Sequence, residues 1–236
     1  MTTLTATPMV MLDVFVAPQS LFERFSSAKK WSWLALLILI TLVVGSSYVF
    51  FNGMSEQWLI EQQLMHAGDM TPAERNAAME MMQQTAKYTG LLGGIFGSIF
   101  QVVITAIFAG YFMLSSKLFA TKSPDFRYGD WFSFSVWTQM PMVISTLGFI
   151  ALFMTASTGD LPLGLANYAS LNQLFLNFEP SHSFYTLTES LNLFSLWSII
   201  IAAIGFKHCC EMPFAKALAV SAMPYLICFG LWFAVI

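Results

Sequence analysis

Four polar side chains lie inside the long apolar blocks of this sequence. Gln101 lies near the middle of one block and Gln139 about a third of the way into another, while Glu189 and Asn192 share a third. A polar group within lipid is costly unless it has a partner, so we expect each of the four to have one. Glu189 and Asn192 are three positions apart, which predicts that they share one face of a helix.

Two interpretations of these four residues remain open. In the first, they line a polar pocket or an ion path inside the membrane. In the second, they form hydrogen bonds between helices, and the Glu189 carboxylate reaches the outer membrane interface along its flexible stem. The first interpretation makes Glu189, Asn192, Gln101 and Gln139 a candidate binding site, and the second makes them structural.

The sequence offers little material for catalysis. It contains no nucleotide-binding loop, no Ser/His/Asp pattern and no zinc-ligand spacing. The three histidines, His66, His182 and His208, are far apart in the chain. We therefore expect a protein that is not an enzyme, with no catalytic residue and no cofactor.

Methionine is frequent in one polar segment that also contains His66. Thioether and imidazole groups are suitable ligands for Cu(I). However, the methionines follow no repeated spacing, and methionine is also a common gap-filling residue in helices. We expect no metal site in this segment, whose methionines are Met54, Met65, Met70, Met79, Met81 and Met82.

The composition defines the elements that must position these residues. Hydrophobic residues make up 57% of the 236 residues and charged residues 10%, whereas a soluble domain carries about 25% charged residues. The apolar residues form blocks of about 20, the length that a helix needs to cross a bilayer. The net charge is −3 and the sequence contains no stripe of basic residues, which argues against a nucleic-acid partner.

We therefore predict an all-α polytopic membrane bundle of about five transmembrane helices, with the lipid bilayer as its first partner. Residues 1–30 form a lead before the first span, with a short interfacial amphipathic helix at 18–25. Between the spans we expect an outer helical hairpin at 54–88 and an interfacial segment at 161–183. The predicted membrane domain covers 31–236, with spans at 31–51, 91–114, 131–154, 184–206 and 215–236.

The basic residues predict the orientation of the spans. Cytoplasmic segments of membrane proteins carry an excess of Lys and Arg. With the N-terminus inside, only Arg75 and Lys87 lie outside, and the inner segments hold Arg24, Lys29, Lys30, Lys117, Lys122, Arg127, Lys207 and Lys216. We expect a cytoplasmic N-terminus, an extracytoplasmic C-terminus and a location in the cell inner membrane.

Two further patterns lie within the spans. Pro141 and Pro224 each lie about ten residues from the inner end of an outward-running span, so they predict helix kinks at similar depth. The second span is rich in small residues, which allow helices to approach closely in lipid. These small residues are Gly93, Gly94, Gly97, Ser98, Ala106, Ala109 and Gly110.

The layout resembles the Yip family, the Ypt/Rab-interacting membrane proteins, and in particular its bacterial branch. The resemblance rests on the short lead with Pro18, Phe22 and Phe25, the five spans, the stretch 134–141 (FSVWTQMP), Gly205-Phe206 and Met223-Pro224-Tyr225. Eukaryotic members act in vesicle traffic and have a long cytoplasmic N-terminal region, whereas this lead has about thirty residues. The resemblance implies a polytopic membrane fold.

Two functional hypotheses follow. The first is a non-enzymatic membrane scaffold that binds copies of itself or other membrane proteins, and the small residues of the second span motivate it. The alternative is a small oligomeric ion channel or transporter with a polar site around Glu189, and the four intramembrane polar residues motivate this one.

Overall fold

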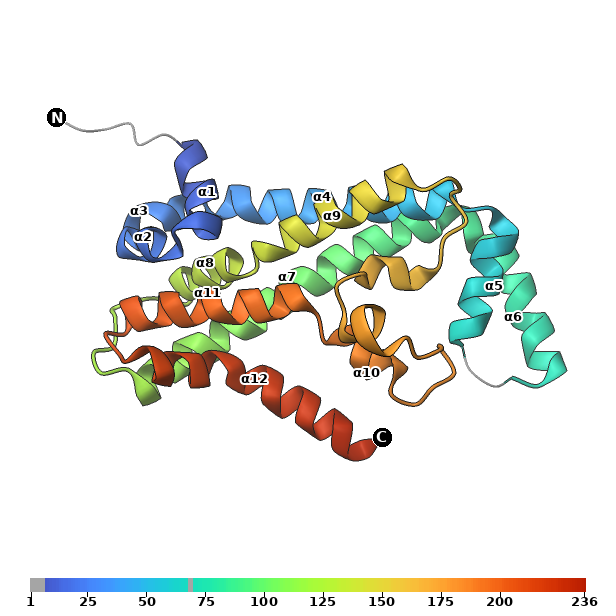
Figure 1. Cartoon of the computed structure of the whole chain (residues 1–236). Helices are drawn as coiled ribbons and strands as arrows, with labels where there is room; N and C mark the ends of the chain where they lie inside the picture. Colours follow the sequence, from blue (N-terminus) through green and yellow to red (C-terminus); the bar gives the residue numbers. More distant parts are fainter. Residues whose placement is uncertain (1–6, 68–69) are drawn as a thin grey trace. The chain divides into compact units, whose positions relative to one another are not determined.

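The computed structural model describes residues 7–67 and 70–236, and every regular element in these ranges is a helix (Figure 1). This confirms the predicted all-α class. The α-helices are α1 (Thr7–Val16), α2 (Pro18–Glu23), α3 (Phe25–Ala28), α4 (Ser32–Gly53), α5 (Glu56–His66), α6 (Pro72–Thr85), α7 (Thr89–Phe119), α8 (Tyr128–Thr138), α9 (Pro141–Thr155), α10 (Tyr185–Ser190), α11 (Leu193–Cys209) and α12 (Phe214–Val235). Shorter helical turns are η1 (Lys29–Trp31), η2 (Ala86–Tyr88), η3 (Leu163–Asn167) and η4 (Asn172–Leu176), the last of them a π-helix.

Several of these helices are long and apolar enough to cross a membrane. In the described part of the chain they are Phe25–Gly53, Pro72–Phe119, Tyr128–Thr155 and Phe214–Val235, and α11 is a shorter apolar helix of 17 residues. The chain is thus an all-α polytopic membrane protein. The stretch 184–206 is interrupted, because α10 ends at Ser190 and α11 begins at Leu193.

The described residues form two compact units. The first unit contains the residues up to Ile40, Phe100–Val143 and Phe194–Val235, and the second contains Thr41–Ile99 and Ile144–Leu193. The boundary between them falls within the three continuous helices α4, α7 and α9. Each unit has its own core.

An aromatic cluster forms the core of the first unit. The ring of Phe134 in α8 lies 5.2 Å from Phe22 of α2 and 5.0 Å from Phe112 of α7, measured between centroids. Phe206 of α11 lies 5.7 Å from Trp131. Leu21, Phe22 and Phe25, the apolar face predicted for the helix at 18–25, are all buried, so this face contacts protein.

Close contact between α4 and α7 builds part of the second unit. A Cβ atom on Gly94 would lie 2.9 Å from the Cα atom of Val44, and one on Gly90 would lie 3.2 Å from the carbonyl oxygen of Ser47. The Ser47 hydroxyl also donates a hydrogen bond of 2.9 Å to the Gly90 carbonyl. The small residues at the start of the second predicted span therefore serve packing within the chain.

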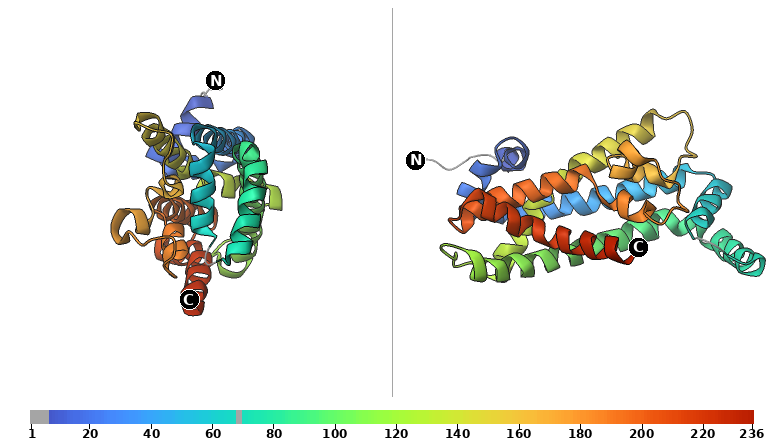
Figure 2. Two further views of the ribbon diagram at one scale, coloured as in Figure 1. Left: turned by 90° about the vertical axis from the view of Figure 1, so that its right-hand side faces the viewer. Right: turned by 60° about the horizontal axis from the view of Figure 1, so that its bottom comes forward.

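The apolar core of the second unit lies where α4, α9 and the segments that follow them meet. It is formed by Phe50, Met54, Leu59, Ala86 and Phe149, and Trp58, Leu161, Leu165 and Tyr168 pack against it. In the same unit, α5 and α6 lie side by side and contact each other (Figures 1 and 2).

Segments predicted for the same membrane side contact one another. On the predicted outer side, the backbone N–H of Ser55 donates to the Asp160 carboxylate at 2.6 Å, and the Trp58 indole donates to the Leu161 carbonyl at 3.0 Å. On the predicted inner side, the Lys122 ammonium lies 3.0 Å from the Glu211 carboxylate. These contacts are those that helices crossing back and forth would bring about.

Candidate functional site

The break between α8 and α9 positions Gln139. Proline lacks an N–H and clashes with the preceding helical turn, so α8 ends at Thr138 and α9 begins with Pro141 as its first residue. The backbone N–H of Met140 donates to the Trp137 carbonyl at 3.3 Å, the acceptor that Pro141 cannot reach. Gln139 lies in the gap between these helices. Pro224, in contrast, lies inside α12, which continues through it.

Gln139 and Gln101 are brought together by a direct hydrogen bond. The Gln101 amide, on α7, donates to the side-chain oxygen of Gln139. The Gln139 amide in turn donates to the Thr105 hydroxyl at 3.1 Å and to the Ser135 carbonyl at 3.2 Å. Gln101 and Gln139, two of the four predicted residues, are thus each other's hydrogen-bond partners within the first unit.

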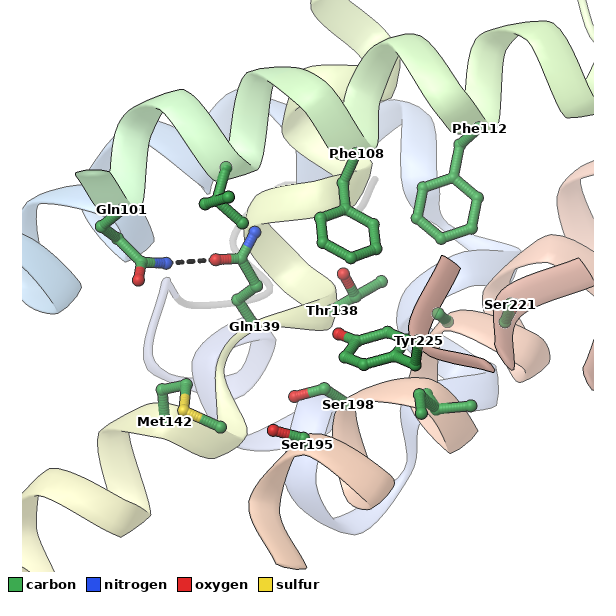
Figure 3. Close-up of a pocket in the computed structure, with 13 residues that line it drawn as sticks. Gln101, Phe108, Phe112, Thr138, Gln139, Met142, Ser195, Ser198, Ser221 and Tyr225 are labelled. Carbon is green, nitrogen blue, oxygen red and sulfur yellow. Dashed lines mark hydrogen bonds between the residues drawn. The ribbon is translucent and has the colours of Figure 1, made fainter. Parts of the chain in front are cut away.

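A cavity of about 140 Å³ adjoins this glutamine pair in the first unit (Figure 3). Residues of α7, α8, α9, α11 and α12 line it, together with Gln139. Its polar lining consists of amides and hydroxyls, from Gln101, Thr138, Gln139, Ser195, Ser198, Ser221 and Tyr225. Its apolar walls include Ile104, Phe108, Phe112, Met142, Ile199 and Ala202.

Two of the lining hydroxyls are buried without a hydrogen-bond partner in the described part of the chain. They belong to Ser198 of α11 and Ser221 of α12, which are 5% and 1% exposed. We had not predicted either serine, nor Thr138 or Tyr225, as a site residue. The available signal was spacing, because Ser195 and Ser198 lie one helical turn apart, as do Ser221 and Tyr225.

Glu189 forms a separate polar cluster in the second unit. Its side chain is 5% exposed, and its Oε1 atom accepts hydrogen bonds from the amides of Asn172 at 3.0 Å and Gln173 at 2.5 Å. Its Oε2 atom is buried, with no partner among the described residues. Both donors belong to η4, and neither is among the four polar residues predicted from the sequence.

The spacing of Glu189 and Asn192 does not place them on one helical face. α10 ends at Ser190, and Leu191 has an extended backbone with φ −79° and ψ 95°. Asn192 instead forms a short antiparallel bridge with Ser170. Around this bridge, the N–H of Leu171 donates to the Leu191 carbonyl at 2.7 Å. The chain turns back on itself here, which brings η4 next to α10.

Tyr185, one turn before Glu189 on α10, connects this cluster to α5. Its hydroxyl lies 3.3 Å from Nε2 of His66, whose Nδ1 lies 2.8 Å from the Gln62 carbonyl oxygen. Burial, and secondly the charge of the Glu189 carboxylate, raise the pKa of the Tyr185 phenol. α10 lies outside the helices that are long enough to cross a membrane.

Most residues that carry the family resemblance are buried in the first unit. Phe22, Phe25 and Phe134 belong to the aromatic cluster, as does Phe206, and Gly205 makes room for its rings. Three further residues of the pattern, Thr138, Gln139 and Tyr225, line the cavity. These residues define a packing arrangement together with the cavity beside it.

Comparison with known proteins supports the family resemblance. A family model described as Yip1 domain matches residues 12–236, which is almost the whole chain. A search of curated proteins and a search of solved structures found no match. The matched range includes the aromatic cluster, the cavity and every apolar helix named above. The chain is therefore a multi-pass membrane protein that belongs to the Yip1 domain family.

Proposed function

We propose that this protein is a non-enzymatic scaffold of the cell inner membrane that binds other membrane proteins, or further copies of itself, through α12. The observation that carries the proposal is the exposure of this helix. In its apolar window 11% of the residues are buried, against 17%, 17% and 33% in the other long apolar helices of the described ranges. Among these four long apolar helices, α12 has the smallest share of buried residues.

The exposure is concentrated in the second half of α12. This half diverges from α11 within the first unit (Figures 1 and 2). Side chains on several faces are exposed there, including Leu226, Ile227, Leu231, Phe233 and Val235. Helices in lipid associate through close packing and hydrogen bonds, since lipid tails are as apolar as the side chains. A helix with few neighbours of its own has surface for such packing with a partner.

Gly90 and Gly94 differ from Gly230 in what surrounds them. Gly90 and Gly94 are occupied, because they bring α7 against α4. Because Gly90 and Gly94 already contact α4, they give no support to a partner protein at this part of α7. Gly230, in the exposed half of α12, would have nothing within 4 Å of a Cβ atom. Glycine at such a position leaves the backbone open to close approach by another helix.

The chemistry of the cavity also supports a role without catalysis. Its polar lining consists of hydroxyls and carboxamides. At neutral pH these groups donate and accept hydrogen bonds, but they are poor proton acceptors. Partner binding requires none of them to react.

Crosslinking in native membranes tests the scaffold proposal. A photo-crosslinking amino acid at Leu231, which is 65% exposed, should yield a discrete adduct with a membrane protein or a second copy. The same residue at Ala217, fully buried in the first half of α12, is the matched control and should yield none. Oxidation of native Cys228, also exposed, reports contact between copies, and Cys228→Ser should abolish any such dimer. Adducts with lipid alone at Leu231 would contradict the proposal.

A second candidate function is a small oligomeric ion channel or transporter, and one observation favours it. Glu189 has a buried oxygen without a partner among the described residues, and its donors Asn172 and Gln173 are neutral amides. A buried carboxylate without a cation is costly, and a bound cation would relieve that cost.

Flux through liposomes separates the two functions. Purified protein would be tested with several cations and anions, comparing the wild type with Glu189→Gln, which keeps the shape of the side chain and removes its charge. A flux that is lost in Glu189→Gln while the protein stays folded favours transport. No flux in the wild type under any gradient leaves the scaffold as the function.

A further inference from the structure

The cavity of the first unit is built for hydrogen bonding without charge. Its lining contains two carboxamides, four Ser or Thr hydroxyls and the phenol of Tyr225, against aromatic and aliphatic walls. Figure 3 shows the hydroxyls of Ser195, Ser198 and Tyr225 turned toward the same side, and the Gln139 amide turned toward Gln101. These groups come from α11, α12 and the break after α8, so only the tertiary fold brings them close together.

The two unpartnered serines indicate that an occupant completes this cavity. A buried hydroxyl without a hydrogen bond has lost its water without replacement, and native proteins rarely leave such groups unsatisfied. Ser198 and Ser221 both line the cavity, both are more than nine-tenths buried, and they lie on different helices. An occupant with at least two hydrogen-bonding groups would satisfy both.

The lining restricts the charge and the size of this occupant. No residue that lines the cavity carries a charge at neutral pH, so an ion would leave its hydration shell without compensation. The volume of about 140 Å³ is close to that of an engineered protein cavity of about 150 Å³ that accepts benzene, a molecule of about six non-hydrogen atoms. The occupant is therefore small and neutral.

We propose that this cavity binds the glycerol unit, an uncharged polyol of about six non-hydrogen atoms, either as a free solute or as the polar end of a monoacylglycerol. Its hydroxyls would pair with Ser198 and Ser221, the two lining hydroxyls that lack a partner among the described residues. Its carbons, or the first carbons of an acyl chain, would lie against Phe108 and Ile199. The proposal goes beyond scaffolding and does not depend on α12 having a partner.

Equilibrium binding to the purified full-length protein in detergent tests the proposal, with two probes used in parallel. The first is radiolabelled glycerol, and the second is a monoacylglycerol detected by native mass spectrometry. Saturable binding of glycerol identifies the free solute as a ligand, and binding of monoacylglycerol alone identifies the lipid. Glycerol 3-phosphate, the charged analogue, should not bind. If neither neutral probe binds saturably, or if the phosphate binds equally well, the proposal is overturned.

Variants locate the binding in the cavity. Ser198→Ala together with Ser221→Ala should weaken binding about tenfold or more, because two hydrogen bonds are lost. The double variant should still fold, since it removes two unsatisfied buried hydroxyls. Ser116→Ala is the matched control. Ser116 is a buried serine of α7 whose hydroxyl donates to the Met113 carbonyl of its own helix, so this variant should bind the ligand as the wild type does. Unchanged binding in the double variant would place the ligand elsewhere and refute the assignment.

Discussion

Gly205 offers a sharp test of how the lead packs into the first unit. An added Cβ atom would lie 2.6 Å from Cε2 of Phe134 and 2.7 Å from Cε1 of Phe22. Neither ring can easily withdraw, because both are buried and each lies within 6.2 Å of the Phe25 ring. Gly205→Ala should therefore destabilise the protein by overpacking.

The size of the effect follows from two opposing contributions. Overpacking of a core costs about 1–3 kcal/mol, and three contacts below 3.0 Å place this site near the upper end. Alanine is the better helix former, by about 1 kcal/mol. The net loss should be about 2 kcal/mol, which corresponds to a fall of about 4–8 °C in Tm for a chain of this length.

Thermal unfolding of purified protein in detergent measures this loss, and the chain supplies matched controls. Gly110 and Gly230 lie in apolar helices with open space around a Cβ atom, so replacing either by alanine should leave Tm unchanged or slightly higher. Phe22→Leu in the Gly205→Ala background should recover part of the loss, because it removes the ring that the methyl group meets. If Gly205→Ala is as stable as the wild type, α2 does not pack on α11 as described.

Three other predictions follow from different parts of the chain. A periplasmic-type reporter fused after Ile236 should be active and a cytoplasmic-type reporter inactive, since the basic residues predict an extracytoplasmic C-terminus; the reverse pattern would mean an even number of spans. Gly94→Ala should lower the stability by about 1–3 kcal/mol in thermal unfolding, because the backbone of Val44 cannot yield as a side chain can. Asn172→Ala should cost about 1–3 kcal/mol by leaving the buried Glu189 with fewer donors. Adding Glu189→Gln should restore part of that loss, and a strictly additive double variant would show that the two side chains are not coupled.

The sequence was sufficient for the class of protein, because the membrane imposes strong constraints on composition. Blocks of about 20 apolar residues and 10% charged residues admit a polytopic helical bundle and little else. Local hydropathy does not signal where an apolar stretch is interrupted, as 184–206 is. There the break at Leu191 depends on a bridge between Ser170 and Asn192, which no local pattern signals.

The candidate site could be predicted only in part. Gln101 and Gln139 were recognisable because a polar side chain in an apolar block needs a partner, and the two do hydrogen-bond to each other. The partners of Glu189 were not recognisable. Asn172 and Gln173 lie in the segment predicted to be interfacial, where amides are ordinary, and they reach Glu189 only because the chain folds back between them.

What the sequence by itself determined is the membrane environment, the helical class and the presence of costly polar groups within it. What only the tertiary structure decided is how those groups are distributed: a neutral cavity completed by Ser198 and Ser221 in one unit, and a buried carboxylate in the other. The physical reason lies in the range of the interactions. Hydropathy acts on each segment separately and can be summed along the chain, whereas a hydrogen bond requires two groups within about 3 Å, and folding alone brings distant residues that close.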